Sequence, residues 1–86
     1  MKTIVETKDA EGFEAFLGEK VSIWCLNYIY TGRLVGVNAT CVKLADASIV
    51  YETGAFTDTG WKDAQSVPWK THYVQISAVE SFGGVK

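Results

Sequence analysis

The sequence predicts a mostly-β domain in which an N-terminal helix precedes five strands of a strongly bent antiparallel sheet, closed into a small barrel. Three observations lead to this prediction. The 86 residues suffice for one domain, residues 1–86, and not for two. Hydrophobic residues make up 48% and charged residues 21% of the chain, a balance typical of globular proteins. After residue 20, short runs rich in β-branched and aromatic residues alternate with turn signals.

The helix is expected at residues 8–17, because apolar residues recur there at helical spacing. Phe13 and Phe16 lie on the apolar side of this pattern. Gly18 follows directly, and glycine is the residue that most often ends a helix. Residues 1–6 are expected to form a short tail or an edge strand.

The five strands are expected at residues 20–26, 30–37, 41–52, 67–71 and 73–79. Gly32 and Gly36 suit a second strand that bends sharply around a barrel. Pro68 favours an edge position for the fourth strand, because proline cannot donate a backbone hydrogen bond. Residues 53–66 are polar and predict a loop or hairpin tip, and residues 81–86 predict a tail. Alternation along the third strand predicts that one face carries Val42, Leu44, Asp46, Ser48 and Val50.

The charge is unevenly distributed along the chain. Residues 1–19 hold five acidic and two basic residues, and the remaining residues hold five acidic and six basic ones, which together give the net charge of −2. This total does not indicate a strong nucleic-acid binder. Cys25 and Cys41 lie in apolar runs, which favours two reduced thiols over a disulfide. The sequence shows neither a signal peptide nor a run of about 20 apolar residues, so a cytoplasmic protein without a membrane span is expected.

Two short motifs resemble the Sm-like (LSm) family over roughly residues 8–80. Residues 32–38 (GRLVGVN) and 44–47 (LADA) are similar to the first Sm motif, with Asn38 where the family usually has aspartate. Residues 69–74 (WKTHYV) take the place of the second motif, usually Ile-Arg-Gly before an apolar strand. Lys70 keeps the basic residue, whereas Thr71 replaces the glycine. Aligned in this way, Cys41 stands where the family has a base-contacting asparagine.

The resemblance implies a five-stranded SH3-like/Sm-like barrel over about residues 20–80. It also implies a homo-oligomeric ring, in which the fourth strand of one subunit pairs with the fifth strand of its neighbour. A ring of about five to seven subunits is expected, because a heterologous interface closes when its rotation allows. Such a ring would bind single-stranded RNA or DNA around its pore.

Four residues are candidates for contacting nucleic acid: Asn38, Thr40, Lys70 and His72. The resemblance implies that Asn38 and Lys70 face the pore, and His72 could stack on a base or contact a phosphate. Thr40 and Tyr73 are weaker additions. Each candidate also has a structural alternative: Asn38 as a turn residue, Lys70 as a solvated edge lysine and His72 as a surface turn residue.

Other basic and aromatic residues have two interpretations each. Arg33 and Lys43 could form a second basic patch with Lys70, or they could be ordinary surface charges paired with carboxylates. Trp24 and Trp69 favour packing in the barrel or at a subunit interface over stacking on bases. Trp61 lies in a polar loop, where it could bind a base or fold back on its own hairpin.

No enzyme activity, metal or cofactor is expected. The single histidine cannot form a His-rich metal site, and neither cysteine has a basic neighbour that would activate it. The function that the Sm-like resemblance implies is a ring that binds single-stranded RNA or DNA in nucleic-acid processing. The alternative is an oligomeric protein scaffold without nucleic-acid binding. A third possibility is a monomeric SH3-like barrel that binds peptides in an aromatic groove.

Overall fold

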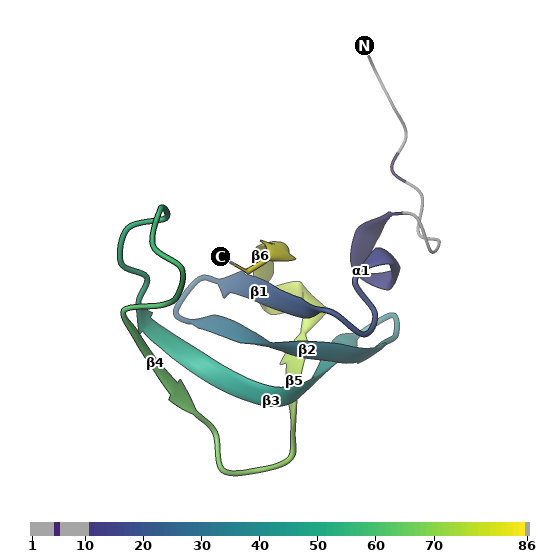
Figure 1. Ribbon diagram of the computed structural model, residues 1–86. Helices are drawn as coiled ribbons and strands as arrows, with labels where there is room; N and C mark the ends of the chain where they lie inside the picture. The colour runs from purple at the N-terminus through teal and green to yellow at the C-terminus, as the bar shows by residue number, and fades with distance from the viewer. Residues whose placement is uncertain (1–4, 6–10, 86) are drawn as a thin grey trace.

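The structure is a computed structural model that describes residue 5 and residues 11–85. It is mostly β, with a single helical turn before six antiparallel strands (Figure 1). The elements in chain order are α1 (Gly12–Ala15), β1 (Lys20–Cys25), β2 (Ile29–Val37), β3 (Cys41–Glu52), β4 (Asp63–Ser66), β5 (Thr71–Gln75), the 3₁₀ turn η1 (Ile76–Ala78) and β6 (Val79–Gly84).

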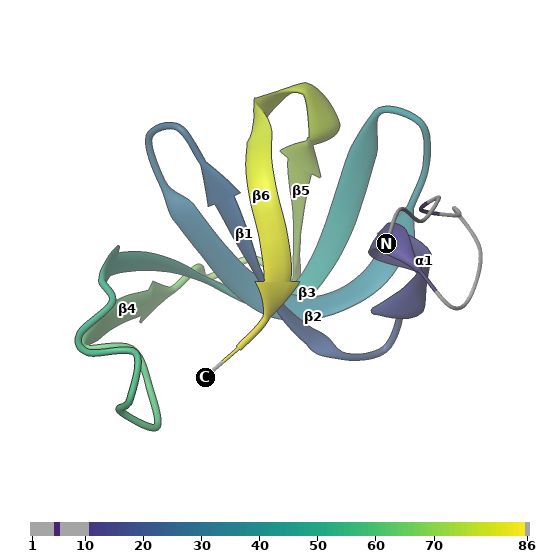
Figure 2. The same cartoon turned by 90° about the horizontal axis from the view of Figure 1, so that it is seen from above.

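All six strands belong to one sheet with the order β4-β3-β2-β1-β6, and β5 pairs separately with β3 (Figure 2). The 12-residue strand β3 therefore has two partners along one edge. Its C-terminal part, residues 48–52, pairs with β4, and its N-terminal part, residues 41–45, pairs with β5.

The change of partner occurs at a bend in β3. Asp46 adopts a left-handed backbone with φ of 53°, which interrupts the strand between its two pairings. Opposite this bend, between β4 and β5, residues 67–70 form a loop outside the sheet. The Val67 amide at the start of this loop still bonds to β3, donating to the Ala47 carbonyl at 3.0 Å. The strand expected at residues 67–71 is therefore mostly this loop, and only Thr71 belongs to β5.

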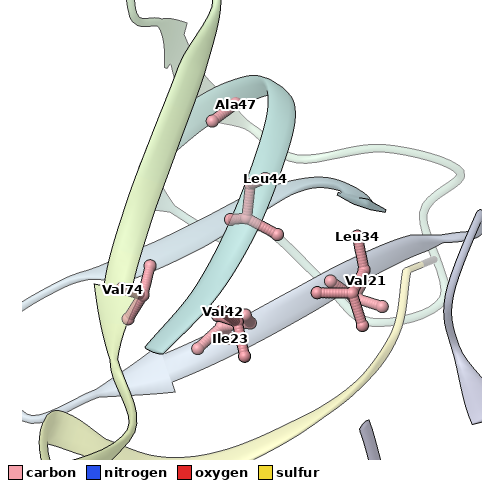
Figure 3. Close-up of a cluster of buried hydrophobic side chains, with 7 residues drawn as sticks. All are labelled: Val21, Ile23, Leu34, Val42, Leu44, Ala47 and Val74. Carbon is pink, nitrogen blue, oxygen red and sulfur yellow. The ribbon is translucent and has the colours of Figure 1, made fainter. Parts of the chain in front are cut away.

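The core lies on the concave side of the bent sheet (Figure 3). Its side chains come from β1, β2, β3 and β5: Val21, Ile23, Leu34, Val42, Leu44, Ala47 and Val74. The bend also changes which residue of β3 is buried, because Asp46 is exposed and Ala47 is 1% exposed. The single face expected for residues 42 to 50 is thus interrupted at Asp46.

The expected closed barrel of five strands is wrong, since the sheet has six strands and is open. β5 is paired with β3 and β6 with β1, and no pairing joins β5 to β6 within the described residues. The cause lies in η1, where the Ile76 amide donates to the Thr40 carbonyl at 2.9 Å before the chain turns toward β1. The strand expected at residues 73–79 is split there, and the expected tail forms most of β6.

The expected N-terminal helix at residues 8–17 is also wrong, apart from four residues of α1. Gly12 has φ of 73°, a left-handed conformation that does not continue a right-handed helix. At the other end, the Gly18 amide donates to the Leu34 carbonyl at 2.7 Å, so the chain has already joined the sheet. Residues 8–10 of the expected helix lie outside the described residues. Phe13 still packs on the sheet, with its ring stacked 3.8 Å from that of Phe82.

The strands expected at residues 20–26, 30–37 and 41–52 agree with β1, β2 and β3 to within one residue at each end. The polar segment at residues 53–66, expected to be a loop or hairpin tip, contains the short strand β4. All four residues of β4 are exposed, so the strand carries no alternation of apolar and polar residues that would predict it.

Candidate functional site

Four aromatic side chains form a continuous row on one surface, which we call the aromatic row: Trp69, His72, Tyr30 and Tyr28. The ring centres are 5.8 Å apart for Trp69 and His72, 5.0 Å for His72 and Tyr30, and 6.3 Å for Tyr30 and Tyr28. The Trp69 indole Nε1 donates a hydrogen bond to His72 Nδ1 at 3.0 Å. This bond fixes the orientation of an indole that is itself 51% exposed.

The row is assembled from three parts of the chain. Tyr28 and Tyr30 are two residues apart at the β1–β2 turn and the start of β2, so both project to the same side. His72 lies on β5, and Trp69 lies in the loop between β4 and β5. The bend at Asp46, which expels residues 67–70 from the sheet, is therefore what places Trp69 beside His72.

A pocket of about 470 Å³, which we call the edge pocket, lies beside the row. It is lined by residues 25–28, 30, 72–75 and 77–78. These residues belong to the end of β1 and the turn after it, to the start of β2, to β5 and to η1. The edge pocket thus lies along β5 at the place where the sheet does not close.

Burial makes two groups of this region harder to ionise. It raises the pKa of the Cys25 thiol, and it raises the pKa of the Tyr30 hydroxyl, to which the nearby Cys25, Tyr28 and Tyr51 add a smaller effect. A protonated thiol is a poor nucleophile. Hydrogen bonding and stacking are therefore the chemistry that this pocket offers.

The charge beside the row is positive. Lys70 is exposed and directly follows Trp69, and Lys43 places its Nζ 5.9 Å from the centre of the Tyr73 ring. No aspartate or glutamate lines the edge pocket. The ion pairs found in the described part of the chain lie elsewhere and join Arg33 to Asp46 at 3.8 Å and Lys62 to Glu52 at 3.4 Å.

The structure brings two of the four predicted site residues together. His72 belongs to the aromatic row and Lys70 directly follows Trp69, whereas Asn38 and Thr40 lie in the β2–β3 turn near the other end of β5. There Asn38 Oδ1 accepts hydrogen bonds from the Thr40 amide at 2.8 Å, the Cys41 amide at 2.9 Å and the Thr40 hydroxyl at 3.1 Å. This is the structural role of a turn asparagine.

The sequence analysis did not single out Tyr28 and Tyr30. Their spacing of two residues after a turn was the available signal, but nothing in the sequence indicated that His72 would pack against them.

The three tryptophans also differ in surroundings. The Trp24 indole donates to Ser22 Oγ at 3.2 Å and its ring lies 6.1 Å from that of Phe56, whereas Trp69 belongs to the row. Trp61 is partly buried between two pockets.

The described residues, 5 and 11–85, contain neither a cluster of metal ligands nor a helix that could cross a membrane. No group of three or more histidine, cysteine, aspartate or glutamate side chains in these residues could hold a metal ion. No helix in these residues has the length and apolar character needed to cross a membrane.

Comparison with known proteins adds no identity. No family model, no curated protein and no solved structure matches the chain. The aromatic row, the edge pocket and the charges around them are therefore the features from which a function is inferred.

Proposed function

We propose that the protein binds single-stranded RNA or DNA through the aromatic row. The observation that carries this proposal is the exposed, oriented Trp69 ring at the end of four contacting aromatic side chains. Every nucleobase has a flat π-face, and stacking on an aromatic side chain contributes about 1–3 kcal/mol per base. Because the bond to His72 already orients the indole, little side-chain entropy would be lost on binding.

The local charge supports the same ligand in spite of the net charge of −2. Lys70 directly follows Trp69 of the row, and Lys43 places its Nζ 5.9 Å from the ring of Tyr73, which lines the edge pocket. Neither lysine forms an ion pair with a carboxylate in the described residues. Several carboxylates lie elsewhere, on α1 and its flanks and in the pairs with Arg33 and Lys62. A phosphate would therefore meet positive charge at the row.

Binding of fluorescently labelled eight-nucleotide oligo-U and oligo-A, followed by anisotropy at low salt, tests the proposal. We expect Trp69→Ala to weaken binding about 5- to 150-fold, the equivalent of one lost stacking contact. Phe56→Ala is the matched control, since this exposed aromatic residue lies against Trp24, outside the edge pocket. It should change the affinity by less than about twofold.

Salt provides the second part of the test. Binding should weaken as the salt concentration rises, and Lys70→Ala should reduce the slope of that dependence by about 0.7, the share of one phosphate contact on a single strand. Absence of binding at low salt, or equal effects of Trp69→Ala and Phe56→Ala, would contradict the proposal. In that case the protein scaffold and the peptide-binding domain would be the remaining functions, and a proline-rich peptide would be the next ligand to titrate.

We also propose that copies of the chain associate into a homo-oligomer, up to a ring of about five to seven subunits. The open sheet supports this, because β4, β5 and β6 each pair on one side only within the described residues. Unpaired strand edges readily pair with other chains. Light scattering at high protein concentration tests the proposal, and a mass near that of one 9.4 kDa chain would contradict it.

A further inference from the structure

A second pocket lies beyond the edge pocket along β5. We call it the turn pocket; its volume is about 660 Å³, and it is formed by residues 39–41 of the β2–β3 turn together with Tyr73, Gln75, Ile76 and Ser77. Tyr73, Gln75 and Ser77 also line the edge pocket. The two pockets are therefore neighbours that share one wall.

Tyr73 is the aromatic part of this shared wall. Its side chain is 58% exposed, and Lys43, its cross-strand partner on β3, places Nζ 5.9 Å from the ring centre. A ligand that crosses the shared wall at Tyr73 comes within reach of this ammonium group. The surface thus offers two neighbouring pockets and a positive charge at the ring of Tyr73, a residue of the wall between them.

We propose that the two pockets hold two adjacent nucleotides of one strand, one base on each side of Tyr73, with the linking phosphate at Lys43. The inference rests on the proposed function and adds to it the minimum ligand, a dinucleotide, and the path of the strand. In a dinucleotide the phosphate links the two nucleosides, and on the protein the ammonium group of Lys43 lies at the ring of Tyr73, in the wall that the two pockets share. No carboxylate lines either pocket to repel the phosphate.

The path also connects the two groups of predicted site residues. The five residues of β5 span about 13 Å. The aromatic row with Lys70 and His72 lies near the start of this strand, and Thr40 contributes to the turn pocket near its end. A nucleic-acid strand that runs along β5 from Trp69 to the β2–β3 turn would pass Lys70, His72 and Thr40.

Competition against the labelled eight-nucleotide oligo-U tests the inference, with uridine monophosphate and the dinucleotide UpU as unlabelled competitors. We expect UpU to compete at least about tenfold more strongly than the mononucleotide, because it fills both pockets. Tyr73→Ala should bring the two competitors to within about threefold of each other. Tyr51→Ala is the control: this tyrosine has a similar exposure of 52%, lines neither pocket and should leave the ratio unchanged.

The position of the phosphate is tested with a UpU analogue whose linkage is an uncharged methylphosphonate. Removal of the charge should weaken competition about fivefold for the unmodified protein and less than twofold for Lys43→Gln. Equal competition by uridine monophosphate and UpU, or an equal loss with the analogue in both proteins, would overturn the inference. If the eight-nucleotide strand still binds in a Trp69-dependent manner, the proposed function would survive that result; if it does not bind at all, both fall together.

Discussion

Gly32 and Gly36 lie on the same strand, and replacing each with alanine should have different consequences for stability. A Cβ atom at Gly32 would lie 3.0 Å from the Ala45 carbonyl oxygen, 3.1 Å from Ala47 Cα and 3.4 Å from Leu44 Cβ. Two of these three atoms belong to the backbone of β3, close to its bend, and cannot move without disturbing the pairing of β2 with β3. The added methyl group would therefore force the two strands apart.

At Gly36 the same atom would meet the Lys43 side chain, at 3.4 Å from Cβ and 3.8 Å from Cδ, which is ordinary contact with a flexible group. Overpacking against a rigid neighbour costs about 1–3 kcal/mol. An alanine that fits without strain stabilises by about 0.4–1 kcal/mol, because the unfolded chain loses freedom. We therefore expect Gly32→Ala to destabilise the protein by about 1–3 kcal/mol, and Gly36→Ala to leave its stability unchanged or slightly higher.

Urea unfolding followed by tryptophan fluorescence, together with thermal unfolding, measures both variants. For a domain of this size each kcal/mol shifts Tm by about 4–8 °C, so the two variants should be separated well beyond experimental error. A Gly32→Ala protein as stable as the unmodified one would refute the close approach of β2 to the bend in β3. Equal destabilisation by both substitutions would refute the difference in their surroundings.

Three further predictions concern the pocket and the turn. Burial raises the pKa of the Cys25 thiol, so less of it is thiolate near neutral pH. In a Cys41→Ser variant, where Cys25 is the one thiol left, iodoacetamide should therefore alkylate the protein more slowly than it alkylates glutathione. An equal rate would contradict this burial. Burial also raises the pKa of Tyr30 above its unfolded value, so its contribution to stability is present below about pH 10 and is lost as the pH rises through the raised value. Tyr30→Phe should therefore lose less stability as the pH rises above about 10 than the unmodified protein does in urea unfolding, and identical alkaline profiles would argue against it. Asn38→Ala should cost about 1 kcal/mol because two backbone amides and a hydroxyl lose their acceptor, whereas Thr40→Val, which removes only the hydroxyl, should cost less. The reverse order in urea unfolding would mean that Asn38 does not hold the turn.

The sequence analysis predicted the first three strands well because their signals are local. β1, β2 and β3 are rich in β-branched and apolar residues and are bounded by turns, and their observed limits lie within one residue of the expected ones. The later strands carry weaker signals. β4 consists of four exposed residues, and β6 ends in Gly83 and Gly84, which are residues that normally argue against a strand.

The helix and the barrel depended on tertiary contacts that periodicity does not report. Phe13 and Phe16 have helical spacing, but they pack against Phe82 from a single turn of helix, and Gly18 already bonds to Leu34 in the sheet. A closed barrel would have required β5 and β6 to pair with each other along their free edges. The bond from Ile76 to Thr40 and the turn η1 prevent this.

The candidate site was predicted in part for a related reason. Lys70 and His72 were selected as candidates. His72 belongs to the aromatic row from its place on β5, and Lys70 lies next to Trp69 in the loop at residues 67–70, which was expected to be a strand. Trp69 was expected to be a packing residue. Its exposure follows from the bend at Asp46, a left-handed residue that no pattern in the sequence indicated. Membership of the Sm-like family stays a prediction.

Titration of the ¹⁵N-labelled protein with unlabelled eight-nucleotide oligo-U at low salt, followed through the indole N–H signals of the three tryptophans, tests nucleic-acid binding at the aromatic row most directly. We expect the Trp69 signal to shift progressively, while the Trp24 signal, whose indole is bonded to Ser22, stays in place. A Trp69 signal that does not move as the oligonucleotide saturates, or a shift confined to Trp24, would contradict binding at this surface.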